Sequence, residues 1–294
     1  MAPVLLALAQ TMGVRSLVCV TAQHRGMLEQ VLGWFQIEPH YDLNLMKPEQ
    51  GLAEFAIRAL VAVSELLKDV QPDVVVVQGD TTTVMMAALS AFYQCIPVGH
   101  VEAGLRTRNR YNPFPEEINR RMAGVLATFH FAPTARAADA LRAEQVPGEN
   151  ILITGYTVVD ALLMTVQCPV NLELDFSLDC RRLILITAHR RESFGASFES
   201  LCLALRDIAE RNTGVEIVYP VHLNPNVRDP ARRILAEPPR IHLLDSLRYE
   251  QFVHLMARAH LILTDSGGVQ EEAPVLGKPT LIMREPLNGQ NRSY

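Results

Sequence analysis

The fold class is decided by residues 72–83, which read Pro-Asp-Val-Val-Val-Val-Gln-Gly-Asp-Thr-Thr-Thr. A near-continuous apolar run of this kind suits a parallel strand that is buried on both faces of its sheet. Gly79 allows a tight turn after the run, and the polar residues that follow are typical of a helix start. The stretch therefore predicts a strand, a turn and a helix in succession.

The same pattern repeats outward from this stretch in both directions. Amphipathic segments with helical spacing separate short β-branched runs, so we predict an α/β protein with parallel sheets. The strands expected in the first half are Arg15–Thr21, Asp73–Gln78, Pro97–Val101, Thr128–Ala132 and Ile151–Thr154. The strands expected in the second half are Leu183–Thr187, Val215–Tyr219, Ile241–Leu244, His260–Thr264 and Pro279–Met283.

The alternation weakens between Val166 and Arg182, where Pro169, Asn171 and Asp175 interrupt it. We place a linker there and predict two doubly wound domains, 1–166 and 167–294. Ligands of such sheets bind at the carboxyl ends of the strands, and a cleft between two domains is the natural place for a site.

Composition and charge narrow the classes of function. The 294 residues include 27 Lys and Arg against 32 Asp and Glu, a net charge of −5, which argues against a general nucleic-acid binder. No apolar run reaches the roughly 18 residues of a membrane span, and Met1–Gln10 lacks the basic start of a signal peptide. The five Cys are dispersed without a CxxC pair, which favours reduced thiols, a cytoplasmic protein and no zinc site.

Two carboxylates follow neighbouring strands of the first half. Asp80 comes directly after Val74–Gln78, and it is either a helix N-cap or a functional acid. Glu102 ends the next strand, where a buried carboxylate needs a partner. Arg106 is the expected partner, and a structural Glu–Arg pair stands beside a catalytic carboxylate as the alternative.

Further strand ends carry polar side chains. Pro115 fits the first turn of a helix, and Glu116 and Glu117 after it either complement the positive helix end or face the site. His189 ends the first strand of the second half beside two Arg, a position that favours function over a structural role. His222 precedes Asn224-Pro225 and is explained equally by a polar turn.

Another element resembles a phosphate-binding turn. Residues 264–272 run from a strand into a helix and contain Ser266, Gly267 and Gly268. Two Gly let the backbone approach an anion, and the helix N-terminus supplies N–H groups. Glu272 lies one turn into that helix, within reach of ribose hydroxyls. A plain glycine turn is the alternative.

Taken together, these segments resemble the bacterial non-hydrolysing UDP-N-acetylglucosamine 2-epimerases. The matching stretches occur in order along nearly the whole chain: VCVTAQHRGMLEQVL, PDVVVVQGDTTT, IPVGHVEAGLRT, PFPEEINRR, ITAHRRESFG, IVYPVHLNPNVR and LTDSGGVQEEAPVLGKP. The resemblance implies two Rossmann-like domains in a glycosyltransferase-B-like arrangement. It also implies conversion of UDP-GlcNAc to UDP-ManNAc without metal or cofactor, a homodimer, and a role in polysaccharide biosynthesis.

The resemblance also implies roles for individual residues. The sugar-site residues implied are Asp80, Glu102, Glu116 and His189. The UDP-site residues implied are Phe252, Ser266, Gly267, Gly268 and Glu272. An allosteric site for UDP-GlcNAc is implied at Gln23, His24, Arg190 and His222, although Gly26 stands where many relatives have a longer polar side chain.

The chain departs from the family at both ends. It begins at Met1-Ala2-Pro3-Val4, after the family's first strand and its G-T-R-P-E loop, and residues 286–294 lack the second R-P-E loop and the terminal helices. We therefore expect a chain truncated at both ends, in which Arg15–Thr21 and Asp73–Gln78 lose the strand between them. The alternatives to an active epimerase are an inactive remnant of the family, a hydrolysing 2-epimerase and a glycosyltransferase of the same fold.

Overall fold

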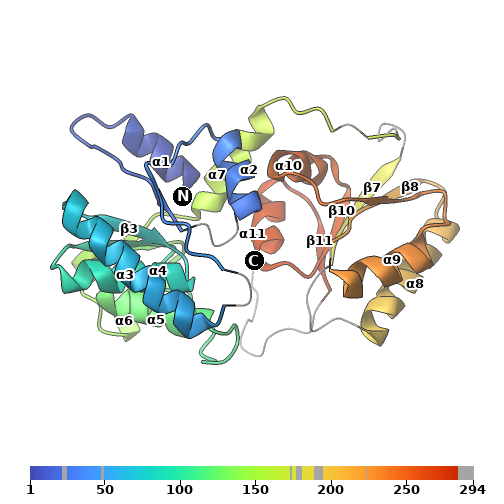
Figure 1. The fold of residues 1–294 in the computed structure, drawn as a ribbon. Coiled ribbons are helices and arrows are strands. Elements are labelled where there is room, and N and C mark those ends of the chain that lie inside the picture. Colours follow the sequence, from blue (N-terminus) through green and yellow to red (C-terminus); the bar gives the residue numbers. More distant parts are fainter. Residues whose placement is uncertain are drawn as a thin grey trace. The chain divides into compact units, whose positions relative to one another are not determined.

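The structure is a computed structural model that describes residues 1–21, 25–47, 50–172, 174–176, 181–188, 195–222 and 224–283. The chain forms two compact units, Met1–Thr157 and Val158–Tyr294, each with its own sheet and helices (Figure 1). The division falls earlier than the expected 166/167 boundary, because Leu162 of the intervening helix is fully buried in the core of the second unit. No helix within the described ranges combines the length and the apolar character that crossing a membrane requires.

The first unit contains two parallel sheets. One pairs β1 (Cys19–Val20) with β2 (Tyr41–Asp42), and the other has the order β3-β4-β5-β6. The strands of the larger sheet are β3 (Val75–Gln78), β4 (Val98–Val101), β5 (Phe129–Ala132) and β6 (Ile151–Ile153). The helices are α1 (Ala2–Ala9), α2 (Arg25–Trp34), α3 (Leu52–Val70), α4 (Thr82–Tyr93), α5 (Glu116–Leu126) and α6 (Ala135–Ala143), with a 3₁₀ turn at Gly148–Asn150.

The second unit is a five-stranded parallel sheet in the order β11-β10-β7-β8-β9. Numbered from β7, this is the 3-2-1-4-5 order of a doubly wound sheet. The strands are β7 (Arg182–Thr187), β8 (Val215–Pro220), β9 (Ile241–Leu244), β10 (Leu261–Thr264) and β11 (Thr280–Ile282). The helices are α7 (Thr157–Gln167), α8 (Ala196–Arg211), α9 (Pro225–Leu235), α10 (Tyr249–Arg258) and α11 (Gly267–Val275).

Alternating side chains of β7 build the two cores of this second unit. Ile184 and Ile186 pack with α8 and α9 on one face, whereas Leu183 and Leu185 pack with α7, α10 and α11 on the other. Helices therefore cover both faces of the sheet (Figure 1). The continuous apolar pattern of this strand follows from its burial on both sides.

The valine run of β3 is less enclosed than its sequence predicts. Only Val77 is buried, while Val74 is 43% exposed. Within the described residues β3 pairs with β4 alone and β1 pairs with β2 alone, so each strand leaves one edge unpaired. Residues of both strands line one cavity of about 600 Å³, whose walls also include Leu5 and Leu8 of α1. In the part of the chain that the structure describes, no strand pairs with both β1 and β3.

The predicted strands all occur, although most are shorter than expected. The largest difference is at Arg15–Thr21, of which only Cys19–Val20 pairs in a sheet. The short strand Tyr41–Asp42 is an addition that the sequence did not indicate. The described residues between Cys168 and Arg181 contain no helix or strand, which fits the predicted linker.

Candidate functional site

Asp80 lies at the carboxyl end of β3, after Gly79 has turned the chain with a φ of 81°. It is not a helix cap, because Thr81 caps α4 by accepting a hydrogen bond from the Val84 N–H at 3.3 Å. The Asp80 carboxylate instead forms an ion pair with the guanidinium of Arg120. The interpretation of Asp80 as a simple N-cap is therefore wrong. Its carboxylate faces α5, the helix that carries Arg120.

Glu102 lies at the carboxyl end of β4, beside Asp80. The Gln78 side-chain amide donates to Glu102 Oε2 at 3.2 Å and also to Thr157 Oγ1 at 3.2 Å. Burial raises the pKa of the Glu102 carboxyl; the Gln78 hydrogen bond opposes this rise, and the nearby charge of Asp80 adds to it. Two neighbouring carboxylates, one of which has a raised pKa, are suited to acid–base chemistry.

The expected pairing of Glu102 with Arg106 is wrong. Nε and Nη2 of Arg106 instead donate to the two carboxylate oxygens of Glu144, each at 2.8 Å. The chain turns away between the two residues, since Glu102 has a φ of 66° and Gly104 a φ of 87°. Gly104 packs so closely that a Cβ would lie 2.2 Å from the carbonyl oxygen of Ala137.

The acids after Pro115 take different positions. Pro115 is the cap residue of α5 rather than part of its first turn, and Glu116 is half-buried in that turn. Glu117 is only 1% exposed. Its carboxylate accepts hydrogen bonds from the backbone N–H groups of Thr107 and Arg108, at 3.0 and 3.2 Å. Complementing the helix end does not account for so complete a burial.

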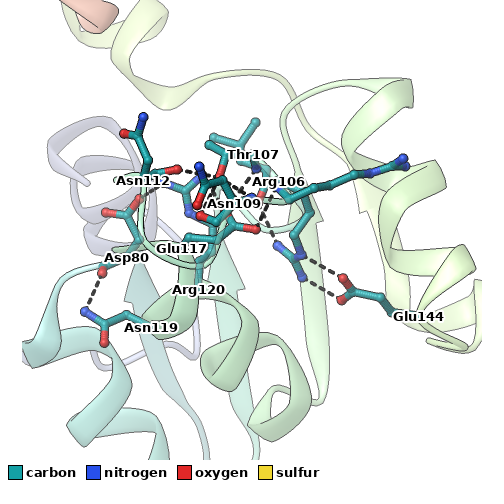
Figure 2. Close-up of polar contacts among 11 residues, drawn as sticks. Asp80, Arg106, Thr107, Asn109, Asn112, Glu117, Asn119, Arg120 and Glu144 are labelled. Atoms are coloured by element: carbon teal, nitrogen blue, oxygen red, sulfur yellow. Dashed lines mark hydrogen bonds and ion pairs between the residues drawn. The ribbon is translucent and has the colours of Figure 1, made fainter. Parts of the chain in front are cut away.

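One polar network joins the loop after β3, the loop after β4 and the start of α5 (Figure 2). Asn119 donates to the Asp80 carbonyl at 3.0 Å and to Thr82 Oγ1 at 3.4 Å. Arg120 lies between Asp80 and Glu117, with its Nη1 atom 3.7 Å from Glu117 Oε2. Sequence reasoning assigned no role to Asn119 or Arg120, whose only signal was their place in the same short motif as Glu116.

His100 supports the Asp80 turn from inside the sheet. It is 1% exposed in β4, and its Nε2 donates to the Gly79 carbonyl at 2.8 Å. Burial lowers the pKa of His100 to about 4, and the nearby cations Arg106 and Arg120 act in the same direction. The imidazole is therefore neutral at pH 7 and serves as a hydrogen-bond donor to the backbone.

The second unit presents its polar turn at the carboxyl end of β10, next to β7. The Asp265 N–H donates to the Thr187 carbonyl at 3.0 Å, and the Ser266 N–H donates to Thr264 Oγ1 at 2.9 Å. These bonds fix the turn that starts α11 at Gly267. The order of the sheet reverses between β7 and β10, which is where doubly wound domains bind ligands.

Space and burial around this turn suit a nucleotide. A Cβ at Gly268 would meet no atom within 4 Å, so the backbone there is open to a ligand. Glu272 lies one turn into α11, and burial raises the pKa of its carboxyl. Phe252 of α10 is half-buried against the neighbouring core. Backbone N–H groups at a helix start suit a phosphate.

Of the remaining expected site residues, only His222 is among the residues that the structure describes. The others lie outside them: Gln23, His24, His189 and Arg190. His222 Nδ1 accepts from the Asn224 N–H at 3.1 Å, and Asn224 in turn caps α9 through the N–H of Asn226. This is the polar turn that the sequence offered as one explanation. Among the residues described, no three His, Cys, Asp or Glu side chains gather as metal ligands would.

Comparison with known proteins gives matches along almost the whole chain. A family model described as UDP-N-acetylglucosamine 2-epimerase matches residues 6–291. A Salmonella typhimurium protein named UDP-N-acetylglucosamine 2-epimerase is 52% identical over 294 residues, covering 97% of this chain and 78% of that protein.

Solved structures agree with the sequence matches. The Neisseria meningitidis UDP-GlcNAc 2-epimerase bound to UDP-GlcNAc is 46% identical with a TM-score of 0.88, covering 97% of this chain and 79% of that one. The S. aureus MnaA–UDP structure is 42% identical with a TM-score of 0.86, covering 97% of this chain and 76% of that one.

Proposed function

The chain belongs to the UDP-N-acetylglucosamine 2-epimerase family, and from this premise we propose that it interconverts UDP-GlcNAc and UDP-ManNAc without hydrolysis. It is an isomerase that acts on a nucleotide sugar. The product of such a reaction supplies ManNAc units for polysaccharide biosynthesis.

The chemistry explains why several acidic groups are needed. The C2 proton of the sugar is not beside a carbonyl, so its direct removal is unfavourable. Elimination of UDP gives 2-acetamidoglucal, and UDP adds back after a proton has returned to the other face. This route requires acid–base groups at C2 and electrostatic support for the departing diphosphate.

We assign the acid–base work to the first unit. Asp80 and Glu102 are the acid–base candidates, Glu116 is a third carboxylate candidate, and His189 supports the leaving diphosphate. The observation that carries the proposal is the pair of carboxylates at adjacent strand ends, where burial and the charge of Asp80 raise the pKa of Glu102. A carboxyl that binds a proton more tightly than usual is suited to return one to carbon.

We assign UDP binding to the second unit. The backbone at Ser266, Gly267 and Gly268 receives the diphosphate at the start of α11, Glu272 receives the ribose hydroxyls, and Phe252 contacts the uracil side. The open space at Gly268, and a helix start at which the Ser266 side chain makes no cap hydrogen bond, support this assignment.

The test follows the sugar by NMR when the purified protein is given UDP-GlcNAc. We expect UDP-ManNAc to grow to a fixed ratio with UDP-GlcNAc, and in D₂O we expect deuterium to enter at C2. Free ManNAc together with UDP would identify a hydrolysing enzyme. An unchanged sugar with a folded protein would overturn the proposal in favour of an inactive member of the family.

Assembly, location and regulation complete the proposal. We expect a homodimer in the cytoplasm, with activation by UDP-GlcNAc at Gln23, His24, Arg190 and His222. The free thiols of Cys19, Cys95, Cys168 and Cys202 support a reducing compartment. Sedimentation would give the mass of two chains, and sigmoidal dependence of the rate on UDP-GlcNAc would reveal the second site.

A further inference from the structure

We propose that Glu117 is a positioning residue of this reaction, which acts through Arg120 to hold the Asp80 carboxylate in place. The inference rests on the proposed epimerase function, because it assigns Asp80 an acid–base task. Glu117 itself stays away from the substrate.

The first step of the argument is the burial of Glu117. At 1% exposure its carboxylate gains nothing from solvent and must be stabilised by its neighbours. The Thr107 and Arg108 N–H groups bind its two oxygens, one each, at 3.0 and 3.2 Å. These bonds tie the loop after β4 to the first turn of α5.

The second step is that the tied loop has an unfavourable backbone. Arg108 has a φ of 63°, in the left-handed region that residues other than glycine rarely adopt. Thr107 Oγ1 donates to the Asn112 carbonyl at 2.7 Å, which closes the loop on itself. The Glu117 carboxylate accepts from the successive N–H groups of Thr107 and Arg108 and thereby fixes this conformation.

The third step is the guanidinium that Glu117 shares with Asp80. Nη2 of Arg120 binds Asp80 Oδ2, while Nη1 lies 3.7 Å from Glu117 Oε2 (Figure 2). The Arg120 side chain is only 13% exposed. Because the guanidinium of Arg120 is planar, only one orientation lets it face both carboxylates at once. Glu117 therefore sets the direction from which Arg120 meets Asp80.

The fourth step excludes a purely local role. An acid in the first turn of a helix stabilises the helix end without needing burial or a partner. Glu54 does this in α3, where it is 57% exposed and pairs with Arg58 one turn later. Glu117 occupies the equivalent part of α5, but its carboxylate accepts hydrogen bonds from the loop that follows Glu102 and lies beside Arg120, which pairs with Asp80.

The experiment compares E117Q with E54Q in the NMR assay with UDP-GlcNAc. Gln keeps the size of the side chain but removes the charge that orients Arg120. We expect E117Q to lower kcat by about 10- to 100-fold, the effect of a slightly misplaced catalytic group, with KM changed less than about 3-fold. E54Q should leave both constants unchanged.

A second background separates positioning from folding. If Glu117 acts through Arg120, then E117Q should lower kcat no further in a protein that already carries R120Q. A residue that only anchors the loop would lower kcat by the same factor in both backgrounds, and that result overturns the inference. If E117Q is unfolded by circular dichroism, E117D takes its place in both backgrounds with the same expectation.

The two proposals fail in distinguishable ways. A wild-type protein that forms no UDP-ManNAc overturns the proposed function and this inference with it. An active wild type with an equally active E117Q overturns the positioning role alone and leaves the epimerase intact.

Discussion

His100 is a buried residue that supports the candidate site through a hydrogen bond to the backbone. Because its pKa is about 4 in the native protein and about 6.5 when unfolded, the unfolded chain binds the extra proton between these values. Stability should therefore be fully present above pH 6.5 and be lost as the pH falls toward 4. The Gly79 carbonyl, and with it the Asp80 turn, depends on this neutral imidazole.

The variant H100Q tests this linkage, because Gln can still donate to Gly79 but does not titrate. Between pH 7 and pH 5 we expect the wild type to lose about 2 kcal/mol more unfolding free energy than H100Q. Urea unfolding at the two pH values measures the difference. H260Q, at an exposed histidine, is the control and should follow the wild type. Equal losses in wild type and H100Q would contradict the neutral buried form.

The acid–base role proposed for Asp80 predicts how D80N changes kcat. In D80N the carboxylate becomes an amide of the same shape, so we expect kcat to fall by roughly 10² to 10⁴, the range for removal of an acid–base group. D139N removes an acid of an exposed Asp–Arg pair and should be fully active. The NMR assay compares them, and a D80N enzyme with near-normal kcat would remove Asp80 from the mechanism.

The sequence predicted that Asp80 and Glu102 follow neighbouring strands, because the ends of adjacent parallel strands must meet at one edge of a sheet. It misassigned Arg106, left the role of Glu117 open and overlooked Arg120 for a different reason. Their partners are backbone N–H groups and side chains reached only after Gly104 and Arg108 take left-handed conformations. Local sequence pattern does not specify which buried acid receives those N–H groups.

At the scale of elements, two glycines differ in whether the surrounding structure leaves room for a side chain. At Gly104 the loop after β4 touches α6, and an Ala side chain would overlap the Ala137 carbonyl at 2.2 Å. We expect G104A to destabilise the first unit by about 3 kcal/mol or more, since φ is also positive there. Thermal unfolding measures this loss, and a wild-type melting temperature would contradict the packing.

Gly268 is the matched position in the second unit, where an added methyl group meets open space. We expect G268A to keep the wild-type melting temperature but to bind UDP at least about 10-fold more weakly, because the methyl group occupies the approach of the diphosphate. Calorimetric titration with UDP measures the affinity. Unchanged binding would move the diphosphate away from the start of α11.

The strands of the second unit and the helices on both faces of its sheet were predictable, because β7 and its neighbours carry complete apolar patterns. The first unit was harder at Arg15–Thr21, where only Cys19–Val20 pairs and with β2 alone. The length of a strand depends on the strands beside it, and the sequence pattern of one segment does not show which strands those are.

At the scale of the whole molecule, the two units have separate cores, and the proposed function gives them separate tasks. We expect two calorimetric transitions on heating, since each unit has its own buried core. UDP at about 100 times its dissociation constant should stabilise the second unit by about 2.7 kcal/mol and raise only its transition. G104A lowers the other transition and so identifies it. A UDP shift confined to the first unit would contradict the assignment.

We expect the cavity between β1 and β3 to affect how the protein behaves in concentrated solution. Among the described residues each of these strands has one unpaired edge beside an apolar wall, and such edges readily recruit an extended segment of another chain. Encounters of this kind depend on two molecules meeting, so turbidity should grow with roughly the square of the protein concentration. We expect V76K to slow such growth, because a charged side chain on an edge strand opposes pairing with another chain.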